Sequence, residues 1–371
     1  MNSFPRTGDG TLRFATLPAL ALSLLFNVAS AQTPGVPVRT VKPVLATQPV
    51  SEDPDDPAIW VNKRNPAQSI VIGTNKIDAS KGGALYVFGL DGKTRQIVKN
   101  LDRPNNVDVE YGLKLGGKRY DIAVCTERLK HRLRVFAISP NGKLSDLAPN
   151  GLPVFKGESG DASEPMGIAL YKRPSDQAIF AVVGRKSGPA KGYLHTYRLR
   201  EGKDGTVQAD FVKAFGAYSG KKEIESICVD DALGYVYYSD EQVCVRKYSA
   251  NPDNPYFGQE LGTFGRENRT GDHEGITLYT KPDGTGYLVS TDQIPAADGG
   301  TRYSVYKREG EPGDRHNQTK PLLVVNGGAD ETDGIEITSA PLGKQFPNGL
   351  LATMNSGPKN FLLFDGKSIV P

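Results

Sequence analysis

Acidic residues recur in this 371-residue sequence just before short apolar segments, and basic or polar residues recur where the next apolar segment ends. The leading acidic residues are Asp55, Asp56, Asp108, Glu164, Glu225, Asp272, Glu274 and Asp333. The trailing residues include Lys76, Arg128, Arg185, Lys186, Asp240, Glu241 and Asp292. Carboxylates held close together repel one another and raise each other's pKa unless a cation joins them. If the fold gathers them, they favour calcium, which takes roughly six to eight oxygen ligands.

The cations among these residues indicate an anionic ligand. Lysine and arginine beside a metal suit a phosphate-like group, which arginine can bind with two hydrogen bonds at once. Metals that prefer histidine or thiolate are disfavoured, because the four histidines and three cysteines form no His-Glu-x-x-His or Cys-x-x-Cys spacing. The chemistry to be positioned is therefore calcium together with a polyanionic substrate.

The same residues belong to a loose repeat of an acidic residue, an apolar strand, a polar turn, a second apolar strand and a polar tail. Its six copies begin at Asp56, Asp108, Glu164, Glu225, Glu274 and Asp333. Further strand-like segments lie between the copies, so each period of roughly 50 residues holds about four strands. The sequence therefore predicts an all-β fold, a six-bladed β-propeller. A β-sandwich is the alternative, and the regular period and constant phase of the acidic residue favour the propeller.

Hairpin geometry determines where these residues meet. An antiparallel hairpin places the start of its first strand beside the end of its second, so the leading acid and the polar tail of each copy share one end. Six hairpins arranged in a ring bring all these ends together. We therefore expect one mouth of the barrel at which carboxylates are interleaved with three or four cations.

Residues 1–31 have the features of a secretory signal peptide. Arg13 precedes an apolar run from Phe14 to Leu25, and Ala29-Ser30-Ala31 supplies an Ala-x-Ala cleavage site. The run is short for a membrane span, and no later stretch approaches about 18 continuous apolar residues. We expect residues 32–371 to form a single propeller domain that is secreted or periplasmic and has no membrane partner.

The charge balance and the cysteines limit other classes of function. Because 45 basic residues face 42 acidic ones, a strong nucleic-acid footprint is not expected. Cys228 and Cys244 fall on the first and third strands of one repeat, and the strand between them keeps their sulfurs too far apart for a disulfide. With Cys125 they are expected to be buried small apolar residues.

Several motifs resemble the β-propeller phytase family, which hydrolyses inositol hexakisphosphate. They are DDPAIW (55–60), TNK (74–76), NNVD (105–108), GYVYYSDE (234–241), EGITLY (274–279) and TDGIEI (332–337). The resemblance implies a 3-phytase-type phosphomonoesterase that needs several calcium ions, catalytic and structural, and uses a metal-activated water without a covalent phosphoenzyme. It also implies that two neighbouring phosphates bind side by side, one for cleavage and one for affinity. The substrate would be phytate as its calcium complex, and the enzyme would act as a monomer.

The resemblance also implies a role for each matching residue. The metal ligands would be Asp55, Asp56, Asp108, Glu225, Glu241, Asp272, Glu274 and Asp333. Glu241, Glu225, Asp272 and Glu274 would be catalytic, positioning the water. The phosphate-binding cations would be Lys76, Arg128 and Lys186, with Arg185 as the alternative to Lys186.

The third repeat departs from the family. Met166 stands where family members often carry a tyrosine that contacts phosphate, and Ser163 replaces a histidine sometimes found nearby. Elsewhere, Lys221 and Lys222 are expected in a solvated loop, and strand alternation should turn His273 away from its acidic neighbours.

The sequence lacks the motifs that other phosphatase mechanisms require, since neither an Arg-His-Gly-x-Arg-x-Pro motif nor a Gly-x-Ser-x-Gly elbow occurs. Two alternatives to the phytase remain open. One is a propeller that hydrolyses sugar lactones, and the other is a calcium-binding propeller without catalysis.

Overall fold

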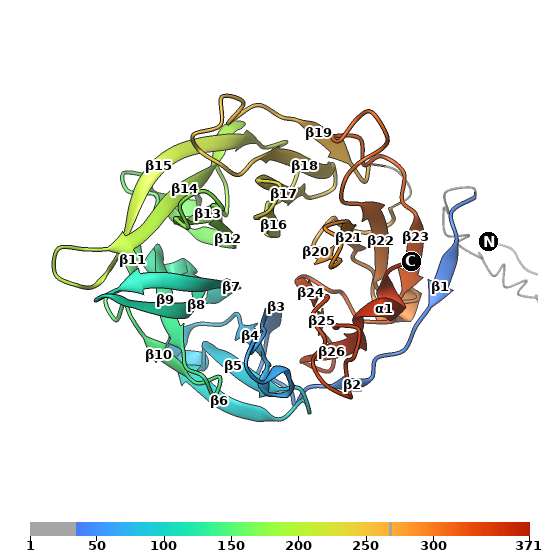
Figure 1. Cartoon of the computed structure of the whole chain (residues 1–371), viewed down its shortest axis with the longest axis horizontal. Helices are drawn as coiled ribbons and strands as arrows, with labels where there is room; N and C mark the ends of the chain where they lie inside the picture. The colour runs from blue at the N-terminus through green and yellow to red at the C-terminus, as the bar shows by residue number, and fades with distance from the viewer. Residues whose placement is uncertain (1–34, 267–268) are drawn as a thin grey trace, which may run out of the picture. The chain divides into compact units, whose positions relative to one another are not determined.

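Six sheets, antiparallel except for one outer strand, form a ring in the computed structural model, which describes residues 35–266 and 269–371 (Figure 1). Each sheet is one blade, and its first strand lies innermost. The predicted six-bladed β-propeller is thus confirmed. The predicted signal peptide, residues 1–31, lies outside the described residues.

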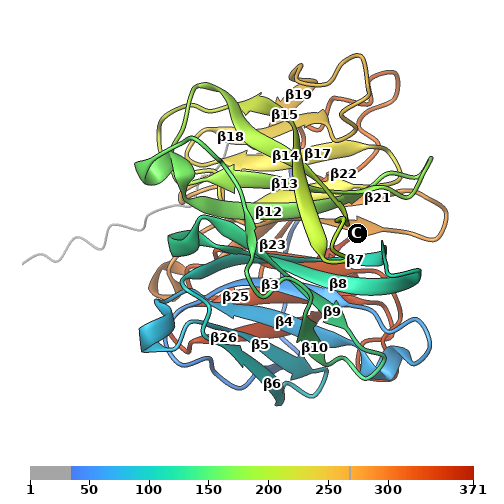
Figure 2. The same cartoon turned by 90° about the vertical axis from the view of Figure 1, so that its left-hand side faces the viewer.

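The first three blades follow the chain directly. Blade one consists of β3 (Pro54–Trp60), β4 (Ile70–Asn75), β5 (Ala84–Gly89) and β6 (Thr94–Lys99). Blade two consists of β7 (Pro104–Leu115), β8 (Lys118–Glu127), β9 (Arg132–Ile138) and β10 (Leu144–Asp146), with β11 (Leu152–Pro153) also paired to β9. Blade three consists of β12 (Pro165–Lys172), β13 (Ile179–Arg185), β14 (Lys191–Glu201) and β15 (Val207–Ala217). Figure 2 shows blade three above blade one, with β7 and β8 between them.

The other three blades complete the ring, and two of them recruit strands from near the start of the described chain. Blade four consists of β16 (Ile227–Asp230), β17 (Tyr235–Asp240), β18 (Cys244–Ser249) and β19 (Gly262–Phe264). Blade five consists of β20 (Ile276–Thr280), β21 (Gly286–Asp292), β22 (Arg302–Lys307), β23 (Leu323–Asn326) and β1 (Val38–Thr40). Blade six consists of β24 (Ile335–Thr338), β25 (Leu350–Asn355), β26 (Asn360–Asp365) and β2 (Leu45–Ala46), and α1 (Gly366–Ile369) follows it.

Strand β2 closes the ring by pairing with β26, so the two ends of the described chain meet in blade six. Strand β1 adds a parallel outer strand to β23. Arg39 of β1 also donates hydrogen bonds to the carbonyl oxygens of Ser368 and Val370. None of the helical segments in the described ranges has the length and hydropathy to traverse a bilayer.

The hydrophobic core is divided into six clusters, one between each pair of neighbouring blades. This follows from the alternation of side chains along a strand, since both faces of every blade pack against a neighbour. Cys228 on β16 and Cys244 on β18 flank β17 and are free and buried, as is Cys125. The prediction that no disulfide joins Cys228 and Cys244 is confirmed.

The innermost strands surround a channel along the ring axis. A cavity of 130 Å³ in this channel is lined by residues from the first strands of all six blades. Side chains on these strands accept hydrogen bonds from backbone N–H groups of the next blade. The pairs are Asp56 with Val107 (3.0 Å), Asp108 with Leu170 (2.6 Å), Ser226 with Ile276 (3.0 Å) and Thr277 with Ile337 (3.1 Å).

Candidate active site

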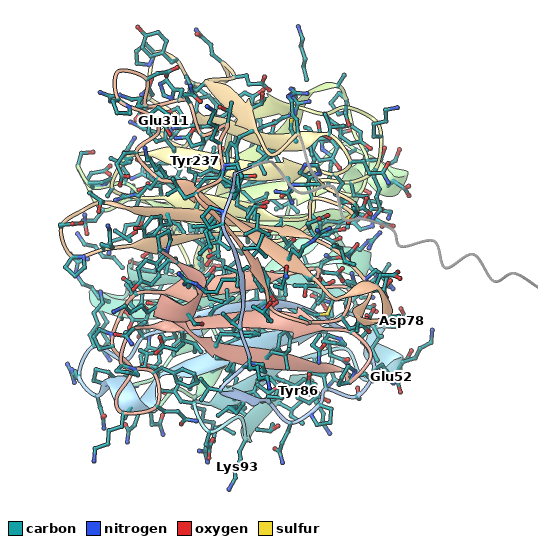
Figure 3. All side chains as sticks on the ribbon, turned by 90° about the vertical axis from the view of Figure 1, so that its right-hand side faces the viewer. Glu52, Asp78, Tyr86, Lys93, Tyr237 and Glu311 are labelled. Atoms are coloured by element: carbon teal, nitrogen blue, oxygen red, sulfur yellow. The ribbon has the colours of Figure 1, made fainter. Side chains whose placement is uncertain are left out.

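The candidate site lies at the end of the channel where the innermost strands begin and the second strands end, which we call the mouth. Pro54 at the start of β3 pairs with Asn75 at the end of β4, as the hairpin geometry predicts. Figure 3 shows Glu52, just before β3, and Asp78, just after β4, on one side of the molecule. Glu311, which follows β22, lies toward the opposite side.

Lys76 is the centre of one group of charges at the mouth. Its ammonium forms an ion pair with Asp55 and lies 3.5 Å from Glu225 Oε1 and 3.7 Å from Asp333 Oδ2. Burial raises the pKa of Asp333 to about 6, against the opposing charge of Lys76 and with help from Glu225. Burial likewise raises the pKa of Asp55. The structure therefore brings four of the predicted site residues together, although they come from blades one, four and six.

Two further cations lie beside this group. Arg128 Nε is 3.0 Å from Glu164 Oε2, and Lys186 forms an ion pair with Glu223. The pKa of Lys186 is lowered by burial and then by the positive charge of Arg128, with a smaller effect from Lys76. Arg128 also donates to Asn105, which donates to Asp55 and Glu225 beside Lys76, so cations from different blades lie in one region, as binding of a multiply charged anion requires.

Arg185 does not lie at this mouth. Its side chain is 1% exposed and donates to the carbonyl oxygens of Tyr193 and Gly192, while its guanidinium lies 4.5 Å from the ring centre of Phe155. Arg185 is the last residue of β13 and Lys186 is the first residue beyond it, so the two side chains leave the backbone in different directions. Of the two candidates, the structure brings only Lys186 together with Lys76 and Arg128.

Two groups of three carboxylates could each hold a metal ion, and Glu241 belongs to both. The first group is Glu223, Glu225 and Glu241, and the second is Glu241, Asp272 and Glu274. Within each group the potential ligand oxygens lie within 4.8 Å of one another. The donors are all hard oxygens, which suits calcium better than zinc or copper.

Glu241 is the most enclosed member of these groups, with a side chain that is 1% exposed. Neither of its oxygens has a hydrogen-bond partner among the described residues, although Lys222 forms an ion pair with it. Burial, opposed by Lys222 and reinforced by Glu225, raises the pKa of Glu241 to about 7. Burial and the charge of Glu241 also raise the pKa of Glu274 well above its usual value. A cation is therefore needed if all these carboxylates are to ionise together.

Lys222 is the cation that the sequence interpretation missed. Its ammonium lies 3.0 Å from Glu241 Oε2, 2.5 Å from Asp272 Oδ2 and 3.5 Å from Glu274 Oε1. Lys222 thus lies in the expected loop with a side chain that is 39% exposed, but its ammonium contacts the acidic group, whereas Lys221 is exposed. The signal that could have found it is its position three residues before Glu225, in the segment that leads into β16.

Asn105 and Glu223 were also not predicted as site residues. Asn105 Nδ2 donates to Asp55 Oδ2 over 3.3 Å and also to Glu225. Arg128 donates to the side-chain oxygen Oδ1 of Asn105 over 3.3 Å. Asn105 thus connects the acidic and basic parts of the mouth. The NNVD and Glu-Ile-Glu patterns contain these residues, but only the spatial arrangement shows that they reach the mouth.

Asp56 and Asp108 do not join either group of three carboxylates. Both line the channel cavity and accept hydrogen bonds from the backbone of the next blade. Burial raises the pKa of Asp108 to about 7 and that of Asp56 well above its usual value. Their positions support a role in joining blades, and their role as metal ligands stays a prediction.

Blade three contributes little beyond Lys186 and Glu164. Met166 is 1% exposed, and its carbonyl oxygen accepts a hydrogen bond from Thr126. Ser163 Oγ donates to the Gly160 carbonyl within a short turn.

His273, just before β20 of blade five, is buried and bonds to the Gly265 carbonyl, in agreement with a structural role.

Fold and mouth together define a six-bladed β-propeller whose acidic and basic site suits metal ions and a phosphorylated ligand. The chain belongs to the phytase family, whose family model, described as Phytase, matches residues 14–360. It is similar to the 3-phytase of Bacillus subtilis (strain 168), with 31% identity over 308 residues, which cover 81% of this chain and 74% of the relative. Membership of this family makes the chain a phosphoric monoester hydrolase.

Proposed function

We propose that this protein is a calcium-dependent phytase that releases inorganic phosphate from myo-inositol hexakisphosphate. The observation that carries the proposal is that phosphate-binding cations and metal-binding carboxylates reach the mouth from different blades. Lys76, Arg128 and Lys186 arrive from blades one to three, and the carboxylates of the second acidic group arrive from blades four and five. The name of the Bacillus subtilis relative, 3-phytase, supports phytate as the substrate.

The acidic groups fit calcium because their ligands are carboxylates alone and because Oε1 of the buried Glu241 has no hydrogen-bond donor among the described residues. Glu223, Glu225 and Glu241 would hold one ion, and Glu241, Asp272 and Glu274 another. Bound calcium would neutralise these acids and lower the pKa of a coordinated water. Asp55 and Asp333, which the resemblance also implies as ligands, lie around the Lys76 ammonium together with Glu225.

The chain's own cations would orient the substrate. Lys76, Arg128 and Lys186 would hold the equatorial oxygens of a phosphate, which leaves the axis through phosphorus open for in-line attack by water. Glu225 and Glu241 would position that water. Attack by water directly on phosphorus needs no covalent phosphoenzyme, and the described residues that gather at the mouth are carboxylates and cations.

Chelation and readdition test this proposal. The purified protein would be treated with EGTA, and phosphate release from phytate would be measured before and after addition of calcium or magnesium. We expect activity to disappear with EGTA and to return with calcium and much less with magnesium, which demands a stricter octahedral geometry. Full activity in EGTA would contradict calcium dependence. Tight phytate binding without phosphate release would favour the non-catalytic propeller, and lactone hydrolysis without phosphate release would favour the lactonase.

We also propose that the domain works outside the cytoplasm as a monomer. The predicted signal peptide at residues 1–31 supports export. Mass determination of the protein recovered from the medium or periplasm would test cleavage after Ala31, and light scattering would test the oligomeric state.

A further inference from the structure

Lys222 places its ammonium inside the second acidic group. The contacts are to Glu241 (3.0 Å), Asp272 (2.5 Å) and Glu274 (3.5 Å), the same three residues whose oxygens lie within 4.8 Å of one another. A metal ion bound by these oxygens would stand within a few ångströms of the ammonium. The repulsion between two such cations in a partly buried site is several times stronger than in water. Both cations therefore cannot occupy the group together.

The backbone near Lys222 is anchored, so a change of occupant need involve only the side chain. Tyr218 donates a hydrogen bond from its hydroxyl to the Lys222 carbonyl, and Ser219 Oγ donates to Asp240 over 2.7 Å. The side chain itself is 39% exposed, compared with 13% for Lys76. Lys222 can thus swing into solvent, whereas Lys76 is enclosed by the mouth.

We propose that Lys222 is a built-in counter-cation that occupies the second acidic group when no metal is bound and leaves it when calcium binds. The proposal rests on the calcium dependence inferred above. In the metal-free protein the ammonium offsets the repulsion among Glu241, Asp272 and Glu274. The same contacts must be broken before calcium enters, so Lys222 weakens calcium binding to this group.

Calcium titration of K222Q tests the proposal, with K221Q as the matched control from the neighbouring, exposed lysine. Glutamine keeps much of the side-chain length and removes the charge. By calorimetry on EGTA-stripped and dialysed protein, we expect K222Q to bind calcium about tenfold more tightly at the affected site than the wild type, because one unit charge no longer competes. K221Q should bind calcium as the wild type does.

A second pair of measurements distinguishes direct occupation of the acidic group by the Lys222 ammonium from a long-range effect of its charge. Thermal melting in EGTA should show a lower Tm for K222Q than for the wild type, and this gap should close or reverse in millimolar calcium. Repeating the titration in about 0.5 M salt should leave most of the affinity gain, because screening weakens distant charges far more than a direct contact. Calcium affinities of K222Q and the wild type that coincide, or a gain that vanishes in high salt, would overturn the proposal.

The test distinguishes failure of this inference from failure of the proposed function. The wild type and both variants would be assayed for phosphate release from phytate in parallel with the calcium titrations. Tighter calcium binding by K222Q without any phosphate release would support the role of Lys222 and refute the phytase activity. A wild-type protein that binds no calcium would refute both.

Discussion

Lys76 and Glu225 approach each other across the mouth, with 3.5 Å between Lys76 Nζ and Glu225 Oε1, although they belong to blades one and four. The contact joins opposite sides of the six-bladed ring, and the two residues are 149 positions apart in the sequence. A cation suited to phosphate and a carboxylate suited to metal therefore share one small volume. This arrangement allows one phosphate to be held by the protein and by a metal ion at the same time.

Replacement of Lys76 by methionine should reduce kcat/KM for phytate about 100-fold or more, because the variant loses a preorganised positive charge from a partly desolvated site. Phosphate release at several phytate concentrations would measure the loss, and circular dichroism would check folding. The control is K81M, since Lys81 lies in the adjoining segment with a 71% exposed side chain. Equal activity of K76M and K81M would exclude Lys76 from substrate binding.

Glu241→Gln should abolish most turnover, by about 1,000-fold, while the protein remains folded. Glu241 belongs to both acidic groups, so loss of its charge weakens two metal sites at once. Glutamine has nearly the same shape, and it removes a buried charge that Lys222 contacts on one oxygen only in the described structure. Calorimetry should show weaker calcium binding alongside the loss of phosphate release. The control is E52Q, because Glu52 is exposed and pairs with Lys359 outside the acidic groups. Unaltered turnover in E241Q would remove Glu241 from the site.

The phase of the repeat was sufficient to predict the ring and most of the mouth. Strand ends follow from hairpin geometry, which is why Asp55, Glu225 and Glu274 were found from the sequence alone. Lys222 was missed because it lies between β15 and β16, where no periodicity indicates the direction of a side chain. Its contacts depend on the path of a loop, which residue spacing does not determine.

Register shifts at the starts of innermost strands are a feature that the hydrophobic pattern did not predict. The pairing of β7 with β8 shifts register between Pro104 and Val107, and that of β12 with β13 shifts between Pro165 and Ile168. A bulge changes which residues face the mouth, and it leaves little trace in a hydrophobic pattern. Asp108 lies beyond the shifted residues of β7, within the regular part of the strand, and lines the channel cavity instead of joining the carboxylate groups.

The neighbouring residues Arg185 and Lys186 should fail in different ways when replaced. R185M should lower the free energy of unfolding by about 3 kcal/mol, because it removes a buried guanidinium and leaves several carbonyl oxygens without donors. K186M should retain stability and raise KM for phytate, because the ammonium lies with the cations of the mouth. Urea unfolding and steady-state kinetics on both variants would measure these effects. The reverse pattern, a stable R185M with a raised KM, would place Arg185 in the substrate site.

The stability of the metal-free protein should depend on pH through Asp231, which follows β16. Burial and the charge of Glu110 raise the pKa of Asp231 to about 9, against a hydrogen bond from the Lys172 N–H. Between its usual pKa of 3.8 and about 9, the folded protein keeps a proton that the unfolded chain releases. The contribution of Asp231 to stability is therefore complete below about pH 4 and is lost as the pH rises toward 9.

D231N should remove this dependence, because asparagine resembles the protonated acid in shape and stays neutral at every pH. Urea unfolding in EGTA at pH 5, 7 and 9 should show the variant gaining on the wild type as the pH rises, by up to about 1.4 kcal/mol per pH unit. Glu110 loses its charged neighbour in the variant, so the difference reports on the buried pair of Asp231 and Glu110. D298N is the control, since Asp298 is exposed and lies outside the buried pair. A constant difference between D231N and the wild type would show that Asp231 ionises normally in the folded protein.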